Sequence, residues 1–147
     1  MRVLMLSTDQ KIFELGSPVR ERVISYGTIA EELHIIVYTK KSTVNPEKLL
    51  NKAGNLQSTT IAANVYIYPT NSKFKVFYFH DALRIAKSLI VSRKLSVITA
   101  QDPFETGLVG YFLKRKFSAK GGSASGGKLP LQLQIHTDFL SLYFWQE

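Results

Sequence analysis

The side chains with the clearest chemical potential lie in the run His136-Thr137-Asp138. His136 closes a short apolar segment whose pattern predicts a β-strand. A histidine at the carboxyl end of a strand can donate a hydrogen bond to a ligand hydroxyl or to a charge that develops during a reaction. Asp138 can accept hydrogen bonds from ligand hydroxyls, and Thr137 lies between the two. A lone histidine is more often structural, so both interpretations of His136 stay open.

A second group of candidates surrounds the start of the first predicted helix. Gly16 and Ser17 stand directly before Pro18, and the free amide groups of a helix that begins there can receive an anion. Arg20, one turn further on, would reinforce such a site if it faced the cleft. In the simpler interpretation, Gly16 makes a turn and Ser17 caps the helix.

Asp102 is the third candidate. It precedes Pro103, and Glu105 completes the spacing of a capping box, so Asp102 is predicted to cap a helix. Because it also follows a predicted strand, a contact with a bound ligand is the alternative.

Several common catalytic signatures do not fit this chain. Gly122 to Lys128 has the spacing of a phosphate-binding loop, but Leu129 stands where that loop needs Ser or Thr, and the segment follows a helix rather than a strand. The dinucleotide fingerprint is absent after the first predicted strand, which disfavours a nicotinamide or flavin oxidoreductase. There is no cysteine, no metal-ligand spacing and no set of nucleophile, base and orienting residue. We therefore expect no metal and no resident cofactor.

The net charge of +8, from 19 basic and 11 acidic residues, favours anionic partners. The basic residues form separate clusters and no reading motif accompanies them, which argues against nucleic acid. Lys73 to Phe79 interleaves lysines with aromatic residues. This stretch either packs under the following helix, rests on acidic lipid or lines an apolar groove. No apolar run is long enough to span a membrane. The expected location is cytoplasmic, with peripheral attachment to the inner face of the membrane as a variant.

The chain of 147 residues predicts a single α/β domain that positions these candidates. Strands are predicted at residues 2–7, 34–39, 65–68, 95–100 and 131–136. Helical patterns are predicted from Pro18 with an apolar stripe to Leu33, briefly after Asn45-Pro46, from a cap at Asp81, and from Pro103 to about Phe117. Strands that alternate with helices pair in parallel, so we expect an open doubly wound parallel sheet, Rossmann-like.

Ligands of such sheets bind at the carboxyl ends of the strands. This rule selects the loop after Ser7, the loop after Tyr68, the turn at Gln101-Asp102 and the run from His136 to Asp138. Gly107 and Gly110 lie inside the last predicted helix, which suggests that this helix approaches the sheet closely. Residues 118–128 are expected to be a flexible Gly/Ser loop, whether natural or engineered.

Taken in order, these segments resemble the N-terminal domain of family-4-type (group 1) glycosyltransferases. The resemblance spans nearly the whole chain apart from the Gly/Ser segment, and its most specific parts are AQDPFETG and IHTDF. It rests on the runs RVLMLST, GSPVRERVISYG, ELHIIVYT, VYIYPT, VITAQDPFETGLVG and LQIHTDF. The family implies a GT-B fold of two facing Rossmann-like domains. The N-terminal domain binds a glycan or lipid-linked acceptor, the C-terminal domain holds a nucleotide-sugar co-substrate, and transfer is metal-independent with retention at the anomeric carbon.

By this resemblance, His136 maps to the histidine that contacts the transferred sugar. Gly16 and Ser17 map to the glycine loop that faces the donor phosphates or the acceptor, although many members carry a Gly-Gly pair there. Asp102 maps to the turn that borders the cleft. The spaced glutamate pair of the family's donor domain is absent from this chain. We therefore expect the acceptor half alone, without transferase activity of its own.

A second hypothesis is a non-catalytic Rossmann-like module. It would bind a nucleotide or phosphate at Gly16, Ser17 and Arg20.

Overall fold

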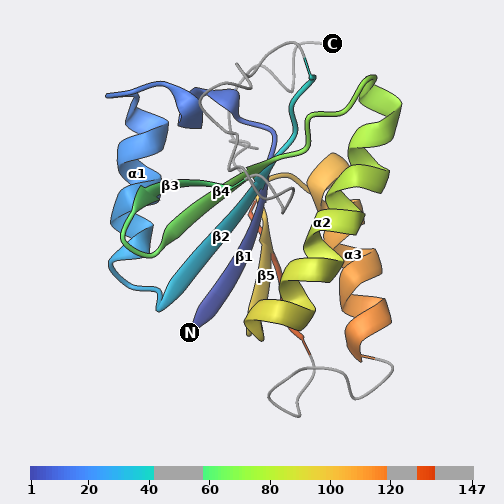
Figure 1. Ribbon diagram of the computed structural model, residues 1–147. Helices are drawn as coiled ribbons and strands as arrows, with labels where there is room; N and C mark the ends of the chain where they lie inside the picture. The colour runs from blue at the N-terminus through green and yellow to red at the C-terminus, as the bar shows by residue number, and fades with distance from the viewer. Residues whose placement is uncertain (42–57, 119–128, 135–147) are drawn as a thin grey trace, which may run out of the picture.

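Six strands form one sheet in the part of the chain that the computed structural model describes, which comprises residues 1–41, 58–118 and 129–134 (Figure 1). The strand order is β3-β4-β2-β1-β5-β6. The strands are β1 (Arg2–Ser7), β2 (Glu32–Val37), β3 (Thr59–Ala62), β4 (Val65–Pro69), β5 (Val97–Ala100) and β6 (Leu131–Leu133). All neighbours pair in parallel except β3 with β4, which are antiparallel. The five predicted parallel strands are present, but β2 lies two residues earlier than the predicted 34–39, β5 begins two residues later than the predicted 95–100, and β6 is shorter than the predicted 131–136. The β3 strand is an edge strand that the sequence pattern does not predict.

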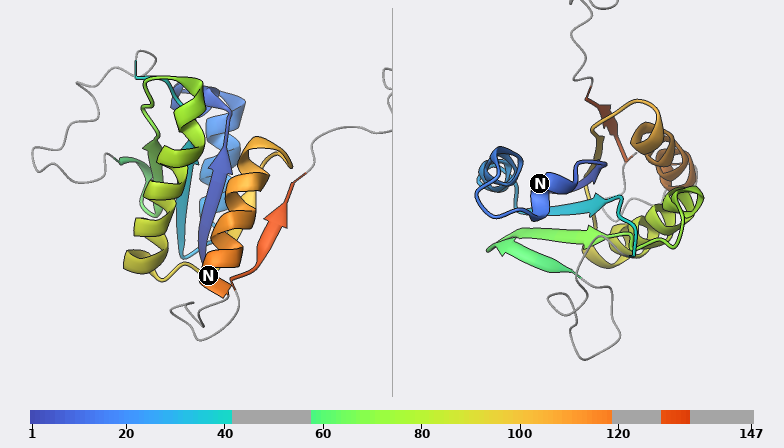
Figure 2. Two further views of the ribbon diagram at one scale, coloured as in Figure 1. Left: turned by 90° about the vertical axis from the view of Figure 1, so that its right-hand side faces the viewer. Right: turned by 90° about the horizontal axis from the view of Figure 1, so that it is seen from above.

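Helices cover both faces of this sheet (Figure 2). They are α1 (Pro18–Gly27), α2 (Tyr78–Arg93) and α3 (Glu105–Ser118), with short 3-10 turns η1 (Gln10–Phe13) and η3 (Lys75–Phe77). A core beneath α1 contains alternate residues of β1, such as Val3 and Met5, and a second core beneath α2 and α3 contains Leu4 and Leu6. Successive side chains of a strand point to opposite faces, so a strand buried on both sides reads as a continuous apolar run. The result is an α/β domain with a mostly parallel sheet, compatible with a Rossmann-like fold.

The first helix begins as predicted but ends earlier. Ser17 Oγ accepts a hydrogen bond from the Arg20 amide at 3.2 Å, which confirms the predicted cap. The predicted stripe reached Leu33, but α1 ends at Gly27 and Leu33 is buried in β2. The Asn64 side chain closes the end of the helix, because its Nδ2 donates to the carbonyls of Gly27 and Ala30 at 2.7 and 2.8 Å. The local periodicity of the sequence cannot reveal this clamp, because Asn64 is far from the helix along the chain.

The other two helix starts also differ from their predictions. The α2 helix begins at Tyr78, directly after η3, and Asp81 is not its cap. The Asp81 carboxylate instead accepts a hydrogen bond from the Ser72 hydroxyl. The α3 helix begins at Glu105, so Pro103 lies in the preceding turn. The helix predicted after Asn45-Pro46 lies outside the described residues. The same is true of the Gly/Ser loop, except that Ser118 is the last residue of α3.

The close approach expected at the two glycines of α3 is confirmed. A Cβ added at Gly107 would lie 2.9 Å from the Asp102 carbonyl oxygen, and one added at Gly110 would lie 2.6 Å from Leu131 Cδ1. The α3 helix therefore sits directly on its own capping turn and on β6. This packing fixes the start of α3 at the carboxyl edge of the sheet.

Candidate functional site

A cavity of about 460 Å³ opens at the carboxyl edge of the parallel strands. Thr8 follows β1 and Tyr38 follows β2, while the 3-10 turns η1 and η3 and the first turns of α2 and α3 supply the remaining walls. The residues that line it are Thr8, Gln10, Tyr38, Lys75, Tyr78, Phe79, Glu105 and Leu108. This is the edge of the sheet that the strand-end rule selects.

The strand order explains why the hollow forms here. From β1 the chain proceeds to β2 and then outward to β4, whereas β5 and β6 lie on the opposite side of β1. Because the loops after β1 and β5 lead in opposite directions, a crevice opens above these two strands. Thr8 and Glu105 lie in the segments that follow these strands. The cavity therefore occupies the topological switch point of the sheet.

Hydrogen bonds hold Tyr38 in the wall. The Gln10 side-chain amide donates to the Tyr38 carbonyl at 3.0 Å, and the Tyr38 hydroxyl donates to the Glu105 carbonyl at 3.3 Å. The rings of Tyr38 and Tyr78 lie against each other, with centroids 5.6 Å apart. These contacts join the segments after β1 and β2 to the starts of both helices on this face.

The two tyrosines are neutral hydrogen-bonding groups. Burial raises the pKa of Tyr38 well above its usual value, and the nearby carboxylates of Asp102 and Glu105 add to the rise. Burial, followed by the charge of Glu105, also raises the pKa of Tyr78. A phenol with a raised pKa stays protonated at neutral pH, so it offers a donor and an aromatic face rather than a base. The walls suit a ligand that has both hydroxyl groups and apolar surface.

The residues predicted at the start of α1 do not line this cavity in the described structure. Gly16 has φ +73°, which favours glycine, and there is open space around the position of a Cβ. Ser17 is buried, and its hydroxyl donates to the Lys11 carbonyl at 2.6 Å while it caps the helix. Arg20 Nη1 donates to the Ile12 carbonyl at 3.4 Å. The side chains of Ser17 and Arg20 thus serve local structure.

Asp102 caps the turn before α3 and does not line the cavity. Its Oδ1 accepts hydrogen bonds from the amides of Phe104 and Thr106 at 3.0 and 3.2 Å. Its Oδ2 lies 2.8 Å from the Thr106 hydroxyl. Contact with a bound molecule stays a prediction for Asp102, as it does for His136, Thr137 and Asp138, which lie outside the described residues.

The sequence does not identify most of the residues that line the cavity. The exception is the stretch from Lys73 to Phe79, for which a groove was one interpretation. Its first part is exposed, and Lys75, Tyr78 and Phe79 line the cavity. Phe79 also packs edge-to-face on Phe112 of α3, with centroids 5.6 Å apart. The stretch therefore both packs under the helix and lines the groove. The sequence pattern placed Tyr38 inside a strand at residues 34–39, whereas β2 ends at Val37, so the strand-end rule did not select Tyr38.

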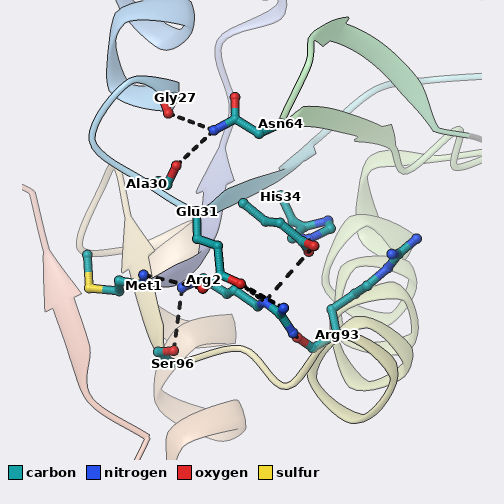
Figure 3. Close-up of polar contacts among 10 residues, drawn as sticks. Met1, Arg2, Gly27, Ala30, Glu31, His34, Asn64, Arg93 and Ser96 are labelled. Carbon is teal, nitrogen blue, oxygen red and sulfur yellow. Dashed lines mark hydrogen bonds and ion pairs between the residues drawn. The ribbon is translucent and has the colours of Figure 1, made fainter.

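A separate polar cluster lies at the opposite, amino-terminal edge of the sheet (Figure 3). His34 is fully buried, with Nε2 2.9 Å from a Glu32 carboxylate oxygen and Nδ1 3.0 Å from the Tyr68 hydroxyl. A carboxylate only accepts, so Nε2 carries the proton and Nδ1 accepts from Tyr68 in the neutral ring. Burial lowers the pKa of His34 despite the opposing effect of Glu32. Both nitrogens are satisfied, as expected of a structural histidine.

Arg2 and Glu31 form an exposed ion pair beside this cluster, at 2.7 Å. Screening by solvent makes such pairs weak contributors to stability. Arg2, Glu31 and His34 are not among the residues that line the cavity.

Comparison of the chain with protein-family models, curated proteins and solved structures finds no match. Within the described ranges, no group of three or more acidic, histidine or cysteine side chains is arranged to hold a metal ion. The helices of those ranges are all too short or too polar to cross a bilayer.

Proposed function

We propose that this chain is the acceptor-binding domain of a retaining glycosyltransferase of the GT-B type, with the acceptor in the cavity at the carboxyl edge. The observation that carries the proposal is the position of that cavity at the switch point of a mostly parallel sheet. The ordered resemblance of the strand ends and helix starts to the family-4-type enzymes supports the same assignment.

The cavity walls match the chemistry of a sugar acceptor. Aromatic faces at Tyr38, Tyr78 and Phe79 suit the apolar C–H surface of a sugar ring. The hydroxyl of Thr8, the amide of Gln10 and the carboxylate of Glu105 suit its hydroxyl groups. The domain therefore binds and orients an acceptor, while a nucleotide-sugar is held by a second, donor-binding domain.

His136 has a defined part in this proposal. At the end of its predicted strand it would hydrogen-bond the transferred sugar and stabilise charge that develops during transfer. In the complete enzyme, His136→Ala should lower turnover strongly while leaving the unfolding temperature within a few degrees. Unchanged turnover would remove His136 from the reaction.

One observation favours a second candidate function. Gly16 leaves open space beside the first turn of α1, a helix of 10 residues. A phosphate group fits such a position, so a nucleotide- or phosphate-binding module is the alternative. The internal hydrogen bonds of Ser17 and Arg20 weaken it, because a phosphate would have to compete with them.

Chemical-shift mapping separates the two functions. The isotope-labelled chain is titrated with mono- and disaccharides, an alkyl glucoside below its micellar concentration, UDP, GDP and their sugar conjugates. We expect glycosides to shift the amides of Thr8, Tyr38 and Leu108. Shifts confined to Gly16, Ser17 and Arg20, caused by nucleotides alone, would replace the acceptor-domain proposal with the module.

A further inference from the structure

Exposed large apolar side chains are concentrated in a few segments that border the cavity and the start of α3. Among the described residues, twelve large hydrophobic side chains are exposed, and eight of them belong to η3 and the residue before it, to α3 and its capping turn, and to β6. We call these eight the aromatic face: Phe74, Val76, Phe77, Phe104, Leu108, Tyr111, Phe112 and Leu133. Scattered exposed apolar residues are ordinary, but a gathered set marks a surface that another body covers.

The arrangement along α3 shows that this gathering is not accidental. Phe104 precedes the helix, and Leu108, Tyr111 and Phe112 follow at offsets of 4, 7 and 8, which places them on one side. The opposite side of α3 is buried against the sheet through residues such as Val109 and Leu113. A helix that is apolar on both sides is normally covered on both.

The aromatic face is continuous with the mouth of the cavity. A shallow apolar hollow of about 610 Å³ lies over α3 and β6, and Glu105 and Leu108 line both this hollow and the cavity. Lys75 lines the cavity from η3, between the exposed Phe74 and Val76. Whatever covers the aromatic face therefore also meets the opening of the cavity.

The charges around this face indicate which kind of partner covers it. Residues 73–79 and 103–118 contain five cations against the single carboxylate of Glu105. The cations are Lys73, Lys75, Lys114, Arg115 and Lys116, and all of them are exposed. The carboxylates that flank these segments, Asp81 and Asp102, accept internal hydrogen bonds. Exposed aromatic and aliphatic side chains flanked by cations are typical of surfaces that insert into the headgroup layer of an anionic bilayer.

We propose that the aromatic face docks on an anionic membrane. Its apolar side chains insert at the boundary between the headgroups and the acyl chains, and its lysines bind lipid phosphates. This surface and its partner go beyond the proposed function and do not depend on it. Because the cavity opens at the same face, the acceptor is a lipid-borne headgroup rather than a soluble glycan. That last clause rests on the proposed function.

Vesicle co-sedimentation tests the docking. The chain is mixed with phosphatidylcholine vesicles, alone or containing phosphatidylglycerol, and we expect binding to the anionic vesicles only. Phe74→Ser with Phe104→Ser should weaken it at least tenfold, because two exposed rings no longer leave water. Lys114→Gln with Lys116→Gln should weaken it about tenfold. The matched control is Leu15→Ser with Ile29→Ser, which are 86% and 80% exposed outside the aromatic face.

The outcomes are distinguishable. Absence of binding to anionic vesicles, or equal loss in the control, would overturn the docking proposal. A concentration-dependent dimer that the phenylalanine variant dissolves would assign the face to a second copy of the chain instead. A preference for single-stranded RNA over vesicles would assign it to nucleic acid. Vesicle binding combined with no glycoside shift in the cavity would preserve the docking and remove the proposed function.

Discussion

Replacement of Asp102 by alanine separates capping from ligand binding at this position. The substitution removes the acceptor for the amides of Phe104 and Thr106. Phe104 is exposed, so its amide can turn to water, but Thr106 is fully buried and its amide is left without a partner. Loss of a helix cap costs about 0.5–2 kcal/mol, and the burial of the orphaned Thr106 amide places this loss at the upper end, so we expect about 2 kcal/mol. For a domain of this size that lowers the unfolding temperature by about 4–8 °C.

Asp102→Asn is the matched control, because its amide oxygen can still accept from both backbone amides. It should unfold within about 2 °C of the parent chain, since a neutral cap is nearly as good as a charged one. Circular dichroism melts measure both variants, and the glycoside titration measures binding by the stable one. An alanine variant as stable as the parent would refute the capping argument. A stable asparagine variant with weakened glycoside binding would show that the carboxylate also contacts the acceptor.

Three further predictions concern the scaffold. Gly107→Ala should destabilise the chain more than Gly110→Ala in denaturant titrations. The new Cβ at position 107 meets a backbone carbonyl at 2.9 Å, whereas the new Cβ at position 110 meets the movable end of a leucine side chain at 2.6 Å. Equal losses of stability in the two variants would contradict the packing. Asn64→Ala should lower the free energy of unfolding by about 1–2 kcal/mol, because the Ala30 carbonyl loses the Asn64 donor and the Gly27 carbonyl keeps only the long hydrogen bond from the Ala30 amide at 3.4 Å. An unchanged value would contradict the clamp. The pKa of His34 is lower in the folded chain than in the unfolded chain, so the unfolded chain takes up the proton first as the pH falls. The contribution of His34 to stability should therefore decline below about pH 6.5 and stay level above it. His34→Gln should remove that part of the pH dependence, and an identical slope in the variant would show that other groups cause it.

The parallel sheet was predictable because its central strands are buried on both faces. Segments such as residues 2–7 and 65–68 read as unbroken apolar runs, and the helical patterns between them imply parallel pairing. The β3 strand was not predictable in this way. Its residues TTIA lie at the end of a polar stretch, and they become a strand only through antiparallel pairing with β4. Edge strands draw their order from a neighbour rather than from their own pattern.

The edge of the sheet that holds the cavity was predictable, but its walls were not. The strand-end rule points to the segment after β1 and to the turn near Asp102, and the cavity lies between the two. Which residues line the cavity depends on how α2 and α3 pack against each other. Phe79 meets Phe112, and Tyr38 meets Tyr78, through contacts between residues far apart in the chain. Such contacts leave no mark in local spacing, so Leu108 carries no sequence signal of its own, whereas Thr8 lies in the loop after Ser7 that the strand-end rule selects.

Thiol protection at the cavity tests the central claim most directly. The chain has no cysteine, so Leu108→Cys introduces a single reactive thiol at the cavity wall, and Ile29→Cys introduces one on exposed surface outside it. We predict that an alkyl glucoside below its micellar concentration slows alkylation at position 108 and not at position 29. Equal rates at position 108 with and without glycoside, or protection by nucleotides alone, would contradict the assignment of this cavity to a sugar acceptor.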